Sequence, residues 1–241
     1  MNRPALTITP PFFELGPKAY CWGKDLLRLA LLADKLSANY GVQVIMTPQY
    51  VDIPLVAREV EHVLVFAQHM DSLRPGRGIG RVLPEALREA GALGVMLNHA
   101  EHPLTRAELV RAVNRAHEVG LATMVCADDP AEAVSIAHLG PNVIILEAPE
   151  LIASGVPAGF RPEAIARADE GVRSVDPGIQ VLHGAGIVGP SDIYDVIAAG
   201  ASGSGSSSAV FTAKEPSAAL EAMIKAAREA WDARNQGGPT K

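Results

Sequence analysis

Short apolar runs alternate with longer amphipathic segments along the whole chain. The runs are rich in branched and aromatic side chains, which is typical of strands buried on both faces. They predict eight strands, the last one weaker: Phe12 to Leu15, Val42 to Thr47, Leu64 to Gln68, Gly94 to Leu97, Ala122 to Ala127, Val143 to Glu147, Gln180 to His183 and Ala201 to Ser208. The amphipathic segments predict a helix after each strand: Asp25 to Ala38, Pro54 to Glu61, Leu83 to Ala90, Arg106 to Val119, Pro130 to Leu139, Pro162 to Val175, Ser191 to Ala199 and Pro216 to Arg234.

Several of these helices carry sequence signals for their first turn. Thr105 precedes one helix and Glu108 follows three residues later, the pattern of a capping box. Proline stands in the first turn of three others, at Pro130, Pro162 and Pro216. These signals support the alternation of strand and helix.

Eight strand-then-helix units in 241 residues favour a (β/α)8 barrel of the α/β class. An open doubly wound sheet would need a glycine-rich fingerprint after its first strand, and no Gly-x-Gly-x-x-Gly follows that strand. We therefore expect one domain over residues 1–241, with a frayed tail from about residue 235. The stretch 200–208 has the composition of a linker but falls where the eighth strand is due. Its small residues predict a barrel interior that is open on one side.

Composition narrows the possible partners. The chain has 21 basic and 27 acidic residues, with no basic run that would follow a nucleic-acid backbone. No targeting segment and no apolar run of about 18 residues is present, so we expect a soluble, cytoplasmic protein without membrane contact. The two cysteines, Cys21 and Cys126, have no metal-ligand spacing. We expect neither a metal nor a cofactor.

Ionisable residues follow three of the predicted strands. Lys18 follows the first strand, His99 and Glu101 follow the fourth, and Glu147 ends the aliphatic run of the sixth. The active sites of such barrels gather at these carboxyl ends. A buried carboxylate base, a neutral hydrogen-bond donor and a cation are what an enolisation requires.

Small residues follow the seventh and eighth strands, at Gly184, Ala185, Gly186, Ser207 and Ser208. Barrels of this kind often bind phosphate there through backbone N–H groups, so a small phosphorylated substrate is implied. Taken singly, each feature has an ordinary explanation: a loop histidine, a solvated lysine or glutamate, a simple turn. Their joint placement at the ends of five strands favours a site.

The same residues carry a family resemblance that covers nearly the whole chain. It is most specific in five segments: Phe66 to His69, Val82 to Ala86, Leu97 to Glu101, Met124 to Cys126, and Glu147 to Gly155. These segments resemble triosephosphate isomerase, especially its shorter archaeal form. The resemblance implies a TIM barrel that catalyses a cofactor-free sugar-phosphate isomerisation through an enediol, most simply between dihydroxyacetone phosphate and glyceraldehyde 3-phosphate in glycolysis.

The resemblance also implies a role for each candidate residue. Glu147 is the base, His99 the neutral electrophile, Lys18 the cation near the substrate oxygens, and Glu101 its ion-pair partner. A lid would run from Pro149 through Gly155. Phosphate would be bound by seven positions: Ala153, Gly155, Gly184, Ala185, Gly186, Ser207 and Ser208. The segment 74–80 corresponds to a loop that reaches a neighbouring subunit, so a homo-oligomer, dimer or tetramer, is expected.

The chain departs from the family pattern at the first strand. Gly16 stands where the family has an asparagine, two residues before Lys18. The missing amide and the small residues of the eighth strand predict an enlarged or reshaped pocket, and such a pocket can favour a substrate longer by a carbon. A four-carbon erythrulose phosphate is therefore an alternative substrate.

Two further alternatives belong to other classes of protein. The chain could be a non-catalytic phosphate-binding barrel, or a lyase that uses Lys18 as a Schiff-base nucleophile, although pairing with Glu101 disfavours the latter. We expect His69 to be a structural residue at the barrel rim. His183 has no role that the sequence assigns.

Overall fold

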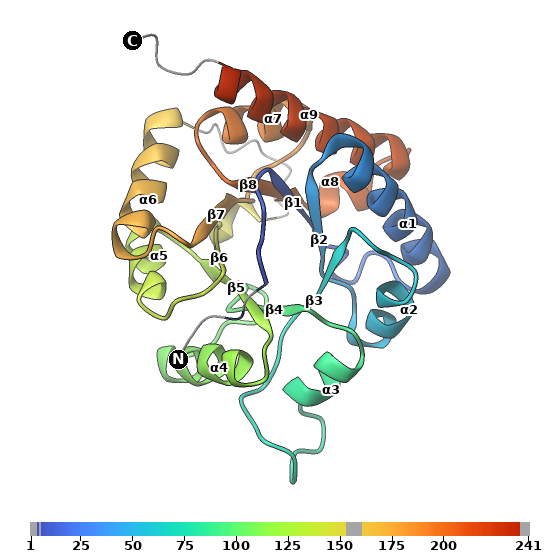
Figure 1. The fold of residues 1–241 in the computed structure, drawn as a ribbon, viewed down its shortest axis with the longest axis vertical. Helices are drawn as coiled ribbons and strands as arrows, with labels where there is room; N and C mark the ends of the chain where they lie inside the picture. Colours follow the sequence, from blue (N-terminus) through green and yellow to red (C-terminus); the bar gives the residue numbers. More distant parts are fainter. Residues whose placement is uncertain (1–3, 5, 153–160, 237–241) are drawn as a thin grey trace.

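Eight parallel strands close into a barrel in sequential order, and helices surround it (Figure 1). The structure is a computed structural model that describes residues 4, 6–152 and 161–236. Each strand pairs with its neighbours along the chain, and β1 pairs with β8 to complete the ring. The (β/α)8 barrel predicted from the hydrophobic pattern is confirmed.

The strands are β1 Phe12–Leu15, β2 Gln43–Met46, β3 Leu64–Ala67, β4 Gly94–Leu97, β5 Ala122–Ala127, β6 Val143–Leu146, β7 Gln180–His183 and β8 Gly203–Ser206. The α-helices are α1 Gly23–Tyr40, α2 Ile53–Ala57, α3 Pro84–Glu89, α4 Arg106–Glu118, α5 Pro130–Ala137, α6 Pro162–Val175, α7 Pro190–Ala198, α8 Ser208–Phe211 and α9 Pro216–Gln236. Two 3-10 turns, η1 Tyr50–Asp52 and η2 Pro149–Leu151, precede α2 and follow β6.

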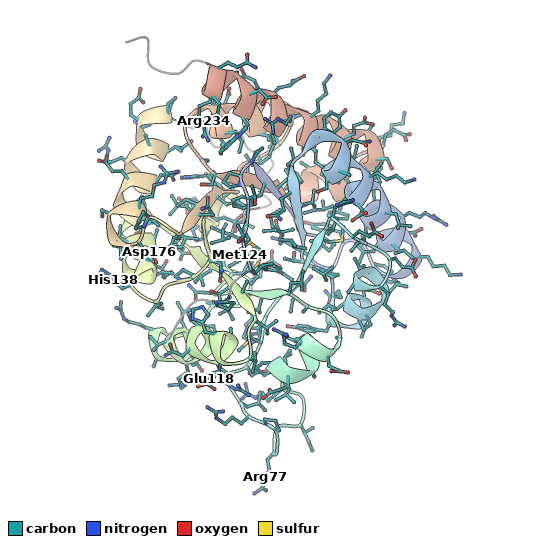
Figure 2. The ribbon with its side chains drawn as sticks, viewed as in Figure 1. Arg77, Glu118, Met124, His138, Asp176 and Arg234 are labelled. Atoms are coloured by element: carbon teal, nitrogen blue, oxygen red, sulfur yellow. The ribbon has the colours of Figure 1, made fainter. Side chains whose placement is uncertain are left out.

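Successive residues of each strand pack on opposite sides of the sheet. Phe12, Ile45 and Met124 belong to the cluster that fills the barrel interior, whereas Phe13 and Leu15 pack outward against the helices. Met124 lies near the centre of the ring in Figure 2. Because parallel partners in register share a face, Glu14, opposite Ile45 on β2, points into the barrel.

The small residues of the eighth strand predicted a barrel interior that is open on one side. That prediction is wrong, because the interior beside β8 is filled. Its inward positions are Gly203 and Gly205, opposite Phe12 and Glu14 of β1. A Cβ atom on Gly203 would lie 2.6 Å from the Phe12 ring, and one on Gly205 would lie 2.9 Å from the Glu14 Cβ. Side chains of β1 therefore fill the space that the glycines of β8 leave empty.

The helix signals read from the sequence are present in the structure. Thr105 and Glu108 form the complete capping box of α4, and Pro130, Pro162 and Pro216 begin α5, α6 and α9. The last helix continues to Gln236, two residues beyond its predicted end. The short α8 and the 3-10 turns were not predicted, because three or four residues carry no periodic pattern.

One loop projects from the barrel between β3 and α3 (Figure 1). Arg77 lies at its tip in Figure 2, and the apolar side chain of Ile79 is fully exposed beside it. The loop is fixed at its base by Asp71, which accepts hydrogen bonds from Arg81 and from the Val82 N–H. An apolar residue is thus held out into solvent by an ordered stem.

Candidate active site

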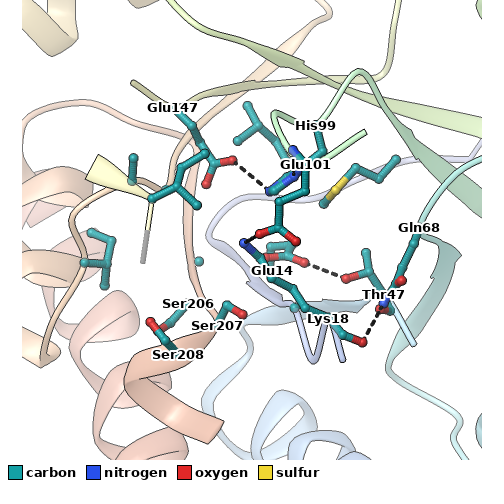
Figure 3. Close-up of a pocket in the computed structure, with 18 of the residues that line it drawn as sticks. Glu14, Lys18, Thr47, Gln68, His99, Glu101, Glu147, Ser206, Ser207 and Ser208 are labelled. Carbon is teal, nitrogen blue, oxygen red and sulfur yellow. Dashed lines mark hydrogen bonds and ion pairs between the residues drawn. The ribbon is translucent and has the colours of Figure 1, made fainter. Parts of the chain in front are cut away.

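A cavity of about 450 Å³ opens at the carboxyl ends of the strands. Its volume lies in the range of small-molecule sites. All the predicted site residues within the described part of the chain line it: Lys18, His99, Glu101, Glu147, Gly184, Ala185, Gly186, Ser207 and Ser208. Ala153 and Gly155 lie outside the described residues. The barrel therefore brings together side chains from β1, β4, β6, β7 and β8 (Figure 3).

Glu147 directly follows β6, and its backbone N–H donates to Ala127 O at 3.0 Å, which extends the strand ladder by one residue. Burial raises the pKa of Glu147 to about 7, against the opposing effect of the positive charge on Lys18. A carboxylate with that pKa accepts a proton readily near neutral pH. Gly184, directly after β7, makes room for it, because a Cβ there would lie 2.6 Å from Glu147 Oε1.

His99 lies beside Glu147 at the cavity, with its Nε2 3.7 Å from Glu147 Oε2. Its other ring nitrogen, Nδ1, accepts the backbone N–H of Glu101 at 3.1 Å. Burial lowers the pKa of His99, and the charge of Lys18 lowers it further. A neutral ring whose Nδ1 accepts must carry its proton on Nε2, so His99 presents an N–H donor to the cavity.

Lys18 adopts a left-handed backbone conformation, φ 44°, just after β1. Such a conformation costs a non-glycine residue about 1–3 kcal/mol and persists only where the surroundings impose it. Here the side-chain amides of Gln49 and Gln68 donate to Lys18 O at 2.9 and 3.1 Å. The strained turn aims the Lys18 side chain into the cavity.

The expected ion pair between Lys18 and Glu101 is present, with Nζ 2.5 Å from Oε1. Burial by itself raises the pKa of Glu101, but the hydrogen bond and charge from Lys18 outweigh it and lower that pKa. Glu101 also holds His99 through its backbone. One residue therefore positions both the cation and the imidazole.

A second buried carboxyl, Glu14, lies in the same cavity and was missed by the sequence analysis. It is 8% exposed, and its Oε1 accepts a hydrogen bond from Thr47 Oγ1 at 2.9 Å. Burial raises its pKa to about 8; the Thr47 hydrogen bond opposes this rise and the charge of Glu147 adds to it. The available signal was an acidic residue at an alternate, inward position of an otherwise apolar strand.

Glu14 also corrects the expectation of extra space at position 16. A Cβ on Gly16 would lie 3.0 Å from Glu14 Oε1 and 3.3 Å from Oε2. The carboxyl group of Glu14 thus occupies the space beside Gly16, so the missing side chain does not simply enlarge the pocket.

Small residues form one wall of the cavity. Gly184, Ala185 and Gly186 follow β7, Ser206 ends β8, and Ser207 and Ser208 come directly after it. The three serines lie together at the lower left in Figure 3. Within the described part of the protein, the buried hydroxyls of Ser206 and Ser207 have no hydrogen-bond partner. These residues line the cavity, and a buried donor left unsatisfied is costly, so a polar ligand bound there could offer these hydroxyls a partner.

Two histidines outside the candidate set have different surroundings. His69 lines the cavity and stacks on His102, with ring centroids 4.0 Å apart, and burial lowers its pKa. His183 points outward from β7 and its Nε2 lies 2.8 Å from the buried Asp169 of α6. His183 therefore joins a strand to a helix, away from the cavity.

Over the described ranges, no group of three or more histidine, cysteine or acidic side chains is placed to hold a metal ion. No helix in the same part of the chain is both long and apolar enough to cross a membrane.

Comparison with known proteins identifies relatives along most of the chain. The family model described as "Triosephosphate isomerase" matches residues 23–227. The triosephosphate isomerase of Sulfolobus acidocaldarius is 35% identical over 232 residues, which cover 95% of this chain and 100% of that protein. The triosephosphate isomerase of Methanosarcina mazei is 36% identical over 218 residues, covering 89% and 98% of the two chains.

A solved structure, the triosephosphate isomerase of Bartonella henselae, superposes with a TM-score of 0.72 and 18% identity. It covers 92% of this chain and 100% of that chain. At that level of identity the likeness concerns the fold, and it agrees with the closed barrel described above.

Proposed function

Because the chain belongs to the triosephosphate isomerase family, we propose that it interconverts dihydroxyacetone phosphate and glyceraldehyde 3-phosphate through an enediol. The catalytic residues are Glu147, His99 and Lys18, and Glu101 positions Lys18 and His99. The observation that carries the proposal is the pairing of a buried carboxylate of raised pKa with a neutral imidazole N–H 3.7 Å away.

Glu147 and His99 suit the two requirements of an enolisation, which are removal of a carbon-bound proton and stabilisation of the charge that develops on oxygen. Glu147 removes a proton from the carbon next to the carbonyl, and the electron pair of that C–H bond forms the double bond of the enediol. Negative charge develops on the carbonyl oxygen, where the His99 Nε2–H donates a hydrogen bond and Lys18 supplies positive charge. The proton of the substrate hydroxyl then passes to the former carbonyl oxygen, the oxygen that released it becomes the new carbonyl, and Glu147 returns its proton to the former carbonyl carbon.

The phosphate group would lie against the wall of small residues. Gly184, Ala185 and Gly186 offer backbone N–H groups, and the buried, unpaired hydroxyl of Ser207 lies beside Ser208 on the same wall. Ala153 and Gly155 of the expected lid would add further N–H groups. Holding the phosphate there leaves the other end of the substrate beside Glu147 and His99.

The relatives favour the triose reaction over the alternatives. A four-carbon ketose phosphate and a non-catalytic phosphate-binding barrel were both suggested by Gly16, and Glu14 fills the space beside that residue. A survey of triose and erythrulose phosphates would separate the substrates. Absence of carbon-bound proton exchange in deuterated water, despite binding, would indicate the non-catalytic barrel.

The proposal includes a cytoplasmic homo-oligomer, dimer or tetramer, that serves glycolysis. What supports self-association is the projecting loop between β3 and α3. It places the exposed Ile79 beside Arg77 at the end of an ordered stem, where an apolar side chain gains by burial in a neighbouring subunit.

The proposal is tested by shortening the base with Glu147→Asp. The substitution withdraws the carboxylate by one methylene, and a misplacement of about 1 Å can lower the rate about 100-fold. We expect kcat to fall by about that factor while KM changes little, because the carboxylate acts in the transition state and not in binding. Steady-state kinetics in both directions would measure it.

The matched control is Glu163→Asp, the same chemical change on the exposed first turn of α6. It should leave both constants as they are in the unmodified protein. Unchanged turnover in Glu147→Asp would contradict the assignment of the base.

A further inference from the structure

The feature of the cavity left unexplained by this mechanism is Glu14. Its side chain lies one inward position above Phe12 on β1, so it ends the packed interior and begins the cavity. Thr47 contacts Glu14 through a hydrogen bond. Gly16 and Gly205 also lie close to it, and they leave room for its carboxyl because they have no side chains. A Cβ on Gly205 would lie 3.2 Å from Glu14 Oε2.

A purely structural role accounts poorly for a carboxyl at this place. The interior around β1 is apolar, and an uncharged aliphatic side chain would pack there without a desolvation penalty. Among the described residues, Thr47 is the hydrogen-bond partner of Glu14, and the nearby cation Lys18 is already paired with Glu101. A buried polar group with one partner retains hydrogen-bonding capacity toward the cavity.

The orientation of that capacity follows from the Thr47 contact. The hydroxyl of Thr47 donates to Oε1, so in the neutral acid the proton is on Oε2. Figure 3 shows the Glu14 carboxyl below His99 and Glu147, close to where the Glu101 carboxylate meets Lys18. A donor on Oε2 therefore enters the space shared by the groups that handle the substrate oxygens.

We propose that Glu14 is a substrate-contacting residue of the isomerisation, whose protonated carboxyl donates a hydrogen bond to a substrate oxygen in the space beside Gly16. The inference rests on the proposed function. The gain is largest where negative charge develops on that oxygen, because a fixed donor in a site shielded from water is worth more in the transition state than in the ground state.

The ionisable groups that face Glu14 determine when it keeps its proton. They are Lys18 after β1, Cys126 on β5 and Glu147 after β6. Its other neighbours, Thr47 after β2 and Gly205 on β8, carry no charge. Burial raises the pKa of both carboxyls, and the charge of an ionised Glu147 raises the pKa of Glu14 further. Two neighbouring carboxyls do not readily carry charge together, so ionisation of one favours the protonated form of the other. An ionised base thus favours a protonated donor at Glu14.

The experiment compares Glu14→Gln and Glu14→Leu with the unmodified protein. Glutamine keeps an uncharged donor of the same size, so kcat/KM at pH 7 should stay within about fivefold. Leucine removes the donor and should lower kcat/KM about 100-fold, the cost of deleting one donor to developing charge. The free energy of unfolding of Glu14→Leu should equal or exceed that of the unmodified protein, because a buried polar group is replaced by an apolar one.

The pH profile of kcat/KM separates contact from packing. For the unmodified protein it should be a bell, rising as Glu147 ionises and falling as Glu14 ionises. In Glu14→Gln the alkaline fall near pH 8 should move to higher pH while the acid limb stays. Substitution of a residue that only supports the fold would not shift the alkaline limb of the pH profile while leaving the acid limb in place.

Failure of the role of Glu14 and failure of the proposed function produce different results. An unmodified protein that isomerises neither triose phosphate would refute the proposed function itself. An active protein in which Glu14→Leu keeps kcat/KM within about threefold would overturn the role of Glu14 and leave the function standing. Should Glu14→Leu fail to fold, Glu14→Gln decides: an unchanged alkaline limb overturns the inference and a shifted limb supports it.

Discussion

At the scale of single residues, the two most deeply buried carboxyl groups of the cavity lie where neighbouring residues have no side chain. Glu147 occupies the space beside Gly184, and Glu14 occupies the space beside Gly16 and Gly205. None of these three glycines has a positive φ, so room for a neighbour, and not backbone conformation, is what each provides. Glycines of this kind belong to the site although they carry no chemistry.

This arrangement predicts a specific result for Gly184→Ala. The new methyl group would lie 2.6 Å from Glu147 Oε1, and the carboxylate, the movable end of a side chain, would turn away. We expect kcat to fall about tenfold or more through misplacement of the base, with little change in the free energy of unfolding. Steady-state kinetics and urea denaturation would show the two effects separately.

The matched control is Gly189→Ala, close by on the same side of the barrel. A Cβ there meets no atom within 4 Å, and its φ of −166° suits any residue. Its activity should match that of the unmodified protein. Equal activity in Gly184→Ala would mean that Glu147 tolerates displacement.

Candidate residues that lie at the end of a strand could be located from the sequence. Lys18, His99, Glu101 and Glu147 each follow an apolar run, and the structure brings all four to one cavity. Glu14 could not be found in the same way, because it lies within a run whose inward phase depends on the register with β2 and β8. Register is a tertiary property that a single strand does not reveal.

At the scale of elements, apolar runs and helix-start signals located the barrel closely. β1, β4, β5 and β7 have the predicted bounds. β8 differs from the other strands, because its sequence, Gly203-Ser204-Gly205-Ser206, has low strand propensity and the composition of a linker. It forms a strand because both neighbours pair with it and because β1 supplies the large side chains that fill its inward side.

A test of this exchange between β1 and β8 is Gly203→Val. Valine favours strands, but its Cβ would lie 2.6 Å from the Phe12 ring, so we expect the free energy of unfolding to fall by about 1–3 kcal/mol through overpacking. The companion variant Phe12→Leu should lose stability through a cavity. Urea denaturation of both single variants would measure the two costs.

The double variant Phe12→Leu with Gly203→Val is the decisive comparison. If the two positions share one volume, its loss of stability should be smaller than the sum of the single losses. Strict additivity would show that the ring and the glycine do not depend on each other, contrary to the contact seen here.

At the scale of the whole molecule, packing and chemistry lie at opposite ends of the barrel. Ile8 of the N-terminal segment joins Phe12, Phe66 and Met124 in an apolar interior, and the cavity begins one layer above, at Glu14 and Glu147. Both carboxyl groups are held at raised pKa, so the folded state binds protons that the unfolded chain releases. This makes the stability of the entire barrel depend on pH.

The sign of that dependence follows from the groups that titrate in each range. Glu14 and Glu147 have pKa values of about 8 and 7 in the fold, against 4.5 for an unperturbed carboxyl. Their contribution is complete below the unfolded value and is lost as pH rises through the folded values. His69 and His99, whose pKa is lowered from 6.5, lose their contribution as pH falls. Between pH 6.5 and 8 the two carboxyls therefore dominate.

The free energy of unfolding should consequently decrease from pH 6.5 to pH 8, by roughly 1.4 kcal/mol per pH unit for a carboxyl that is protonated in the fold and ionised in the unfolded chain. Urea denaturation across this range would measure the slope. Glu14→Gln should flatten it, since the amide does not titrate, whereas Glu163→Gln on the exposed surface of α6 should leave it unchanged. A flat profile for the unmodified protein would show that Glu14 is ionised in the fold, and an ionised Glu14 could not donate a hydrogen bond to the substrate.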